Sequence, residues 1–292
     1  MELHKLHYLE VVKRALAEDI GSGDVTTNSI IPPEATTNGY IYAKENGIVA
    51  GLPVAALVFE TLDPRIVFTP QKQDGDRVEP GDVLAQLEGP ARSILTGERV
   101  ALNLLQRLSG IATKTAALVE NLTYYNTAVV DTRKTTPGLR VLEKYAVRVG
   151  GGQNHRFGLY DAVLIKDNHI KVAGGIKKAI ALARKNVPHT MKIEVEVEDL
   201  KGVQEALEAK ADVIMLDNMD LETMREAVKM VNGQALVEAS GGITEDRLLE
   251  IAKIGVDLVS MGGLTHSVKA LDISLDVGEI KINTPHDNLQ GD

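Results

Sequence analysis

The stretch Lys192-Ile-Glu-Val-Glu-Val197 places a charged residue at every second position. Alternate side chains of a strand point to opposite faces, so Lys192, Glu194 and Glu196 share one face and the apolar residues share the other. The apolar face fits a layer of helices, which leaves three charges on the inner face of a sheet. Unpaired charges are not tolerated in a packed interior. The stretch therefore predicts a barrel whose interior is polar and occupied.

Similar apolar runs recur on both sides of this stretch, with helical patterns between them. From residue 127 onward they span 127–131, 162–166, 192–197, 212–216, 235–238 and 257–261. Repeated strand–helix units predict an α/β fold with a parallel sheet. Glycine pairs follow the last two runs, and such late phosphate loops favour a (β/α) barrel over a doubly wound sheet. Six strands are fewer than the eight of a closed barrel, so we expect an incomplete (β/α) barrel.

The first part of the chain has a different pattern. Residues 6–18 predict an amphipathic helix, and residues 39–50 and 64–88 predict short strands joined by turns. Residues 92–122 predict a long helix that links two domains. Its apolar stripe includes Val100, Leu104 and Leu108.

Residues 131–171 form a cationic segment in an acidic chain. The segment has eight Lys or Arg and four Asp or Glu, whereas the whole chain has a formal net charge of −9. Its local field attracts a small, multiply anionic ligand, while the net charge disfavours nucleic acid and anionic membranes. The chain has no cysteine, which excludes disulfides and Cys-ligated metals. With no signal peptide or membrane span in the pattern, we expect a cytoplasmic protein.

The predicted strand ends all carry chemically useful groups, and in barrels this end of the sheet is the active face. These groups are Asp131, Lys166, Glu196, Asp217, Ser240 and Gly262. Nearby cations can hold carboxylates, because a guanidinium offers a planar fork and an ammonium a point charge. The cations are Arg133, Lys134, His155, Arg156 and Lys166. Surface solvation is the alternative, and it fits poorly for Lys166, which ends an apolar run.

Two acids and two glycine pairs add to this chemistry. Glu196 and Asp217 suit Mg²⁺ bound together with ligand phosphates and hydroxyls. Their alternative role is an internal salt bridge with Lys192 or Lys166. The segments Ser240-Gly241-Gly242 and Gly262-Gly263 allow backbone N–H groups to approach a phosphate. Their alternative role is to form tight turns between strand and helix.

Taken together, the motifs resemble the quinolinate phosphoribosyltransferase family over roughly residues 10–277. They are Glu18-Asp-Ile-Gly-Ser-Gly-Asp-Val-Thr-Thr, Asn103-Leu-Leu-Gln-Arg-Leu-Ser-Gly-Ile-Ala-Thr, Asp131-Thr-Arg-Lys-Thr-Thr-Pro-Gly-Leu-Arg, Gly150-Gly-Gly-Gln-Asn-His-Arg, Leu164-Ile-Lys-Asp-Asn-His, Glu238-Ala-Ser-Gly-Gly-Ile and Leu264-Thr-His-Ser. The resemblance implies that quinolinate and phosphoribosyl pyrophosphate give nicotinate mononucleotide, pyrophosphate and CO₂, with Mg²⁺, in de novo NAD biosynthesis. It also implies an N-terminal α/β sandwich domain of residues 1–102, completed by residues 268–292, and a catalytic barrel of residues 103–267.

The resemblance further implies roles for single residues. The quinolinate carboxylates would be bound by Arg133, His155, Arg156 and Lys166. The catalytic set would be Lys134, Lys166, Glu196 and Asp217, with Lys134 between substrate and phosphates and the two acids holding ribose hydroxyls and Mg²⁺. Phosphate would be bound by Lys134, Ser240, Gly241, Gly262, Gly263 and His266. Arg99 would enter the quinolinate site of a neighbouring subunit, in a homodimer or a dimer-based hexamer.

Three other functions stay open from the sequence. A paralogous pyrophosphorylase-like protein associated with molybdate transport shares much of this scaffold, although the complete set of cations favours quinolinate. A Schiff-base aldolase barrel would use Lys166 as its nucleophile. A non-catalytic phosphate- or carboxylate-binding module would bind ligand without releasing pyrophosphate. The tail from Asn283 has no counterpart in the resemblance.

Overall fold

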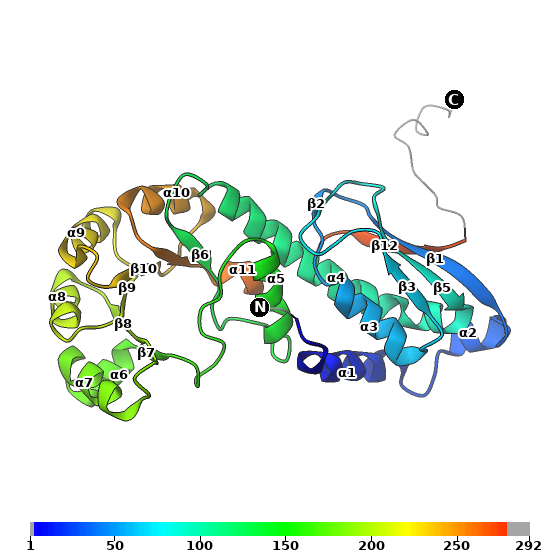
Figure 1. The fold of residues 1–292 in the computed structure, drawn as a ribbon, viewed down its shortest axis with the longest axis horizontal. Helices are drawn as coiled ribbons and strands as arrows, with labels where there is room; N and C mark the ends of the chain where they lie inside the picture. Colours follow the sequence, from blue (N-terminus) through cyan, green and yellow to red (C-terminus); the bar gives the residue numbers. More distant parts are fainter. Residues whose placement is uncertain (1–2, 279–292) are drawn as a thin grey trace. The chain divides into compact units, whose positions relative to one another are not determined.

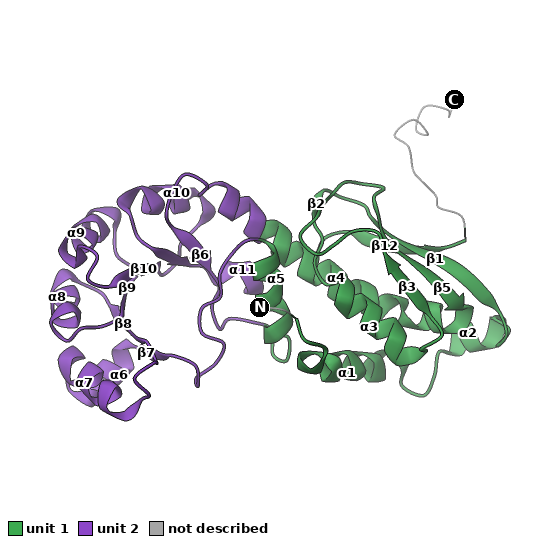
Figure 2. Ribbon diagram, viewed as in Figure 1, with its two compact units in different colours: residues 1–114, 136–150, 268–292 green, residues 115–135, 151–267 purple. Residues whose placement is uncertain are grey.

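The computed structural model describes residues 3–278, so the tail from Asn283 lies outside the described residues. The chain divides into two compact units (Figure 2). Unit 1 comprises residues 1–114, 136–150 and 268–292, and unit 2 comprises residues 115–135 and 151–267. The sequence placed the boundary at residues 102 and 103 and gave the whole of 103–267 to the barrel. In the structure, residues 103–114 and 136–150 belong to unit 1.

Unit 2 contains a parallel sheet with the strand order β6-β11-β10-β9-β8-β7. Its strands are β6 (Ala128–Val130), β7 (Val163–Ile165), β8 (Ile193–Val197), β9 (Val213–Asp217), β10 (Leu236–Ser240) and β11 (Leu258–Ser260). Met215 of β9 is the register partner of Glu196 in β8 and of Glu238 in β10. The strands β6 and β7 lie at the two edges, so the expected α/β fold with an incomplete barrel is confirmed.

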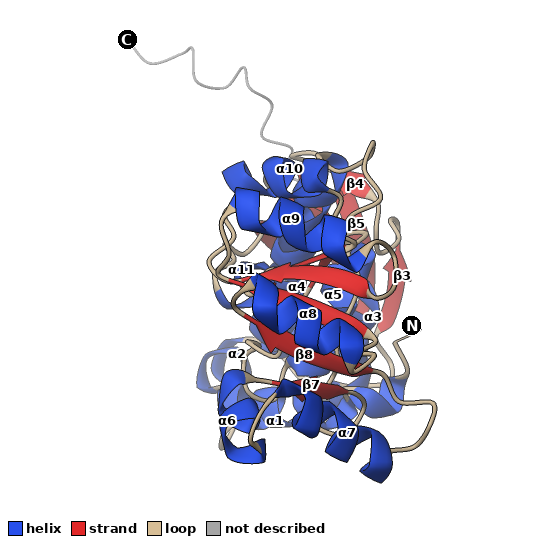
Figure 3. Cartoon of the chain, turned by 90° about the vertical axis from the view of Figure 1, so that its left-hand side faces the viewer, coloured by secondary structure: helices blue, strands red, loops and turns tan. Residues whose placement is uncertain are grey.

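Helices follow the strands of unit 2 and cover the outside of the curved sheet (Figures 1 and 3). They are α6 (Asp167–Ala173), α7 (Ile176–Asn186), α8 (Leu200–Glu208), α9 (Leu221–Val231) and α10 (Glu245–Ile254). The short α11 (Gly263–His266) follows β11 and is not part of this outer layer. Asp199 and Asp220 begin α8 and α9, because their carboxylates accept backbone N–H groups of Gly202 and Thr223. These caps lie just after β8 and β9 and fix where the strands end.

Unit 1 contains an antiparallel sheet with the order β12-β1-β5-β3. Its strands are β1 (Thr36–Ala43), β3 (Val67–Pro70), β5 (Val83–Pro90) and β12 (Ile273–Val277), and β2 (Gly47–Ile48) pairs separately with β4 (Arg77–Val78). Figure 1 shows β12, near the end of the described chain, beside β1, near its beginning. Residues 273–277 therefore supply an edge strand to the sheet built by the first hundred residues.

The helices of unit 1 are η1 (Lys5–His7), α1 (Leu9–Ile20), α2 (Val25–Ile30), α3 (Leu52–Leu62) and α5 (Arg140–Val149). The long α4 (Ala91–Glu120) contributes residues to both units and agrees with the helix expected at 92–122. Its predicted stripe of Val100, Leu104 and Leu108 is buried. Gly97 allows α4 to pack closely on α3, because a Cβ there would lie 2.8 Å from a Leu62 methyl group.

One prediction from the opening stretch is wrong. Lys192 does not share the inner face with Glu194 and Glu196, because β8 begins at Ile193. Its side chain is 71% exposed, and its ammonium lies 3.7 Å from the Asp212 carboxylate. A lysine at the start of a barrel strand can reach water and an acid on the neighbouring turn, so it has no need to enter the interior.

None of the helices among residues 3–278 combines the length and apolar character needed to cross a membrane.

Candidate active site

A cavity of about 890 Å³ opens at the carboxyl ends of the strands of unit 2. Twelve of the thirteen predicted site residues line it. They are Arg133, Lys134, His155, Arg156, Lys166, Glu196, Asp217, Ser240, Gly241, Gly262, Gly263 and His266. The thirteenth, Arg99, is an exposed residue of α4 in unit 1 and lines a separate pocket there with Asp24 and Thr96.

Arg156 forms the buried part of the cationic wall. Its Nη1 donates to the carbonyl of Ala162 at 3.2 Å, while its Nε is buried without a hydrogen-bond partner among residues 3–278. Burial lowers the pKa of Arg156, and the nearby charge of Arg133 lowers it further. A buried, unsatisfied guanidinium N–H beside a second cation is a place where an anion would be stabilised.

The loop after Arg156 is stabilised by hydrogen bonds to the carboxylate of Asp161, a residue of the same loop. The Asp161 carboxylate accepts the backbone N–H groups of Phe157 at 2.6 Å and Gly158 at 2.9 Å. These bonds close the loop immediately before Ala162, whose carbonyl receives Arg156. The hydrogen bonds within residues 157–162 therefore fix the position of the Arg156 guanidinium.

Lys166 and Glu196 form an ion pair across β7 and β8. The Lys166 ammonium donates to Glu196 Oε2 at 2.5 Å, with the lysine side chain 46% exposed. This is one of the two salt bridges that the sequence offered as the alternative role of Glu196. The pair does not exclude ligand binding, because a half-exposed lysine can exchange one carboxylate for another at little cost.

The ends of β9 and β10 form a narrow corner. Asn218 donates from its side chain to Asp217 Oδ2 at 2.7 Å and from its backbone to the Ser240 carbonyl at 3.0 Å. Gly241 follows with φ of +94°, and a Cβ there would lie 2.3 Å from Asn218 Oδ1. Only glycine fits at this position, so its backbone stays accessible to a ligand.

A second glycine corner follows β11. The Thr265 hydroxyl donates to the Lys134 carbonyl at 2.8 Å, which ties the segment after β6 to α11. A Cβ on Gly262 would lie 2.8 Å from Lys134 Cδ and 3.1 Å from His266 Cδ2. Two cationic or ionisable side chains thus converge on a glycine backbone, as phosphate recognition requires.

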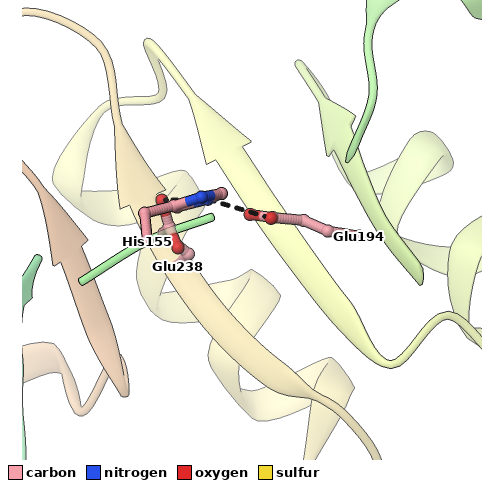
Figure 4. A group of neighbouring side chains, drawn as sticks. All are labelled: His155, Glu194 and Glu238. Carbon is pink, nitrogen blue, oxygen red and sulfur yellow. Dashed lines mark ion pairs between the residues drawn. The ribbon is translucent and has the colours of Figure 1, made fainter. Parts of the chain in front are cut away.

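Two glutamates and a histidine, His155, Glu194 and Glu238, meet inside the barrel (Figure 4), and His155 and Glu238 line the cavity. His155 Nε2 lies 3.0 Å from Glu194 Oε2 and 3.8 Å from Glu238 Oε1. Burial and the charge of Glu194 raise the pKa of Glu238 to about 7. The sequence prediction gave no role to Glu238, although its position two residues before Ser240 on one strand places both side chains on the same face.

Glu196 and Asp217 offer a donor set that fits Mg²⁺. They end neighbouring strands and both line the cavity. Their carboxylate oxygens are hard ligands, and Mg²⁺ commonly binds one or two carboxylates with the remaining positions taken by water and substrate phosphate. These two residues could therefore hold the ion at the cavity wall, between the cations and the glycine corners.

Comparison with known proteins gives one family. The model of the quinolinate phosphoribosyl transferase N-terminal domain matches residues 24–109, and the model of the C-terminal domain matches residues 111–276. The chain is 48% identical over 275 residues to a probable nicotinate-nucleotide pyrophosphorylase (carboxylating) of Bacillus subtilis, covering 94% of this chain and 95% of the relative. It is 48% identical over 282 residues to a probable enzyme of the same name from Methanocaldococcus jannaschii, covering 94% and 98%.

Solved structures agree with the sequence relatives. NadC from Streptococcus pyogenes superposes with a TM-score of 0.92 at 46% identity, covering 96% of this chain and all of that one. The nicotinate-nucleotide pyrophosphorylase from Francisella tularensis superposes with a TM-score of 0.91 at 42% identity, covering 95% and 98%. Human nicotinic acid phosphoribosyltransferase, at 14% identity and a TM-score of 0.61, shares the fold.

Proposed function

The chain belongs to the quinolinate phosphoribosyltransferase family, and from this premise we propose that the cavity of unit 2 binds quinolinate and phosphoribosyl pyrophosphate side by side. The enzyme transfers the phosphoribosyl group to quinolinate with decarboxylation, a step of NAD biosynthesis that yields nicotinate mononucleotide, pyrophosphate and CO₂. The observation that carries the proposal is the convergence of the cationic wall and both glycine corners on one cavity.

In this proposal the cationic wall binds quinolinate. The ligand has two adjacent carboxylates, and Arg133, Arg156 and Lys166 supply three cations in one cavity. Arg156 uses its unsatisfied Nε, and Lys166 leaves Glu196 for a substrate carboxylate. Positioning two anions that repel each other in water removes much of the barrier, because well-oriented reactants reach high effective concentrations.

The glycine corners bind the phosphates of the second substrate. Gly241 and Gly262 have no side chain to cover the backbone, and Lys134 and His266 add charge beside Gly262. Glu196 and Asp217 hold the ribose hydroxyls, and their charge stabilises the oxocarbenium-like ribose that forms as pyrophosphate leaves. Mg²⁺, when bound by these two acids, would neutralise the departing pyrophosphate.

Decarboxylation then follows from the chemistry of the product ring. Attack by the ring nitrogen makes a pyridinium, and the positive nitrogen stabilises the carbanion left when the 2-carboxylate departs as CO₂. A proton from water then adds to this carbon and gives nicotinate mononucleotide. This step needs no Schiff-base lysine and no organic cofactor. The protein's part is to hold the ring while Arg156 and the neighbouring cations keep the remaining carboxylate in place.

The subunit arrangement and the location of the enzyme are also part of the proposal. We propose a homodimer, or a hexamer built of dimers, in which Arg99 of one chain completes the quinolinate site of another. We propose that it works in the cytoplasm, because phosphoribosyl pyrophosphate carries several charges and does not cross membranes unaided.

The test is to supply the protein with quinolinate, phosphoribosyl pyrophosphate and Mg²⁺ and to follow nicotinate mononucleotide and CO₂. We expect product from quinolinate and little from nicotinate, because nicotinate leaves part of the cationic wall buried and unpaired, at about 1–3 kcal/mol or more per group. Omission of Mg²⁺ with a chelator present should abolish turnover. Equal use of both acids would contradict the assignment of the cationic wall.

A further inference from the structure

Glu194 and Glu238 bring two carboxyl groups to one buried imidazole. One oxygen of each glutamate and one nitrogen of His155 all lie within 4.8 Å of one another. Glu194 is on β8 and Glu238 on β10, and their side chains meet inside the barrel on either side of the histidine (Figure 4). Glu238 is 1% exposed, and Oε1 of each glutamate is buried without a hydrogen-bond partner among residues 3–278. Such a cluster needs a positive charge to be stable.

The hydrogen bonds of His155 argue against a metal ion as the positive charge that this cluster needs. Its Nδ1 accepts the backbone N–H of Arg156 at 2.7 Å, which places the ring proton on Nε2. That nitrogen faces Glu194 Oε2 at 3.0 Å and donates to it. A metal bound at Nε2 would need the lone pair that this tautomer lacks, and the nearby Arg156 guanidinium would repel it.

A proton on one carboxyl group satisfies the cluster instead. Two carboxyl groups this close and this buried resist ionising together, so the last proton of the pair leaves only at a raised pKa. The groups facing Glu238 are Glu194 from β8, His155 from the segment before β7 and the Ser260 hydroxyl from β11, and β9 between β8 and β10 presents Met215. Glu194 already accepts from His155 and lies near the charge of Arg156, whereas Glu238 is the more deeply buried of the two. Glu238 is therefore the group that holds a proton below its raised pKa of about 7 and loses it above that pH.

Glu238 also lines the cavity, beside His155 and Arg156. We propose that Glu238 is a positioning residue that takes up one proton when quinolinate binds and so removes a negative charge from beneath the dianion. This inference rests on the proposed function, because it takes the cavity as the quinolinate site. The protonated carboxyl group keeps Glu194 and His155 in place. The His155 ring in turn accepts the backbone N–H of Arg156 and so fixes the position of that residue.

The sign of the pH dependence follows from linkage. The pKa of Glu238 in the free protein is raised to about 7, and the charges of bound quinolinate raise it further. Below this pH the proton is already present and affinity for quinolinate does not depend on Glu238. Above it, each molecule of quinolinate must bring in a proton, so its KM rises toward about tenfold per pH unit.

Calorimetry on the wild-type protein tests the proton directly. Quinolinate is titrated at pH 7 and pH 8.5 in two buffers that differ in ionisation enthalpy. We expect uptake of up to about half a proton per site at pH 7 and more at pH 8.5, because a pKa of about 7 leaves Glu238 half ionised at the first pH and almost fully ionised at the second. Glu238→Gln should abolish this uptake. The absence of uptake by the wild type, or unchanged uptake by the variant, would overturn the proposal.

Kinetics separate this role from a structural one. In Glu238→Gln the KM for quinolinate should no longer rise between pH 7 and 8.5, while the pH dependence of the KM for phosphoribosyl pyrophosphate stays as in the wild type. Glu222→Gln, at an exposed position on α9, is the matched control and should keep the wild-type profile. Failure of the protein to make nicotinate mononucleotide at any pH would instead refute the proposed function. If Glu238→Gln does not fold, the wild-type calorimetry alone decides.

Discussion

Arg156 shows, at the scale of a single residue, why the geometry of a cation matters as well as its charge. Its Nη1 is bound to the Ala162 carbonyl and its Nε is left for a ligand. A lysine at this position has three N–H donors on one nitrogen and does not reproduce the two separate positions of Nη1 and Nε. The guanidinium can therefore bind the loop through Nη1 and the substrate through Nε, an arrangement that a lysine ammonium does not match.

We predict that Arg156→Lys lowers kcat/KM for quinolinate nearly as far as Arg156→Ala, by about a hundredfold in each case, since charged hydrogen bonds contribute about 1.5–3 kcal/mol each. Steady-state kinetics measure the effect. Arg184→Lys is the matched control, because exposed Arg184 also binds a carbonyl, that of Lys210, and lies outside the cavity. Recovery of most of the turnover with lysine would show that Arg156 acts through its charge alone.

Glu196 binds Lys166 in this structure, and in the proposed reaction it binds the ribose and Mg²⁺. We predict that Glu196→Gln slows the single-turnover rate at least about a hundredfold, because it removes charge beside the developing oxocarbenium ion. Quinolinate affinity should not fall, because the substitution releases the Lys166 ammonium for the substrate. Rapid-quench single-turnover assays and equilibrium binding give the two quantities. A normal rate would leave the salt bridge as the whole role of Glu196.

At the scale of elements, the sequence predicted the strands of unit 2 well because each side chain reports the face on which it lies. The alternation at β8 placed Glu194 and Glu196 inside the barrel, and the structure agrees. It failed for Lys192, since alternation does not say where a strand begins. The sequence also gave Glu238 no role, because its contacts with His155 and Glu194 come from segments far apart in the chain.

The turns between strands and helices set the shape of the phosphate corners. We predict that Gly241→Ala raises the KM for phosphoribosyl pyrophosphate at least about tenfold, because its Cβ would overlap Asn218 and force the corner open. Gly255→Ala is the matched control: φ is +93° there, but no atom lies within 4 Å of the added Cβ. That variant should lose about 1 kcal/mol of stability and keep its KM. Equal KM values for both variants would contradict a phosphate site at Gly241.

At the scale of the whole molecule, Arg99 is the predicted site residue that the cavity of unit 2 does not contain. Its stripe neighbours Val100, Leu104 and Leu108 are buried within the chain, so they give no reason to expect a partner. Arg99 itself is exposed on α4. The argument for a shared site therefore rests on the family resemblance and on the position of this one exposed guanidinium.

A mixing experiment distinguishes a shared site from one built by a single chain. Arg99→Ala and Lys166→Ala should each be nearly inactive alone, since each removes a predicted quinolinate contact. In a heterodimer of the two variants, one site would combine both defects and the other would have neither, so about half of the wild-type activity should return per heterodimer. Native mass spectrometry establishes that subunits have exchanged, and product formation is measured on the same sample. A site made within one chain stays damaged in every subunit, so exchange without recovered activity would show that Arg99 does not serve a partner.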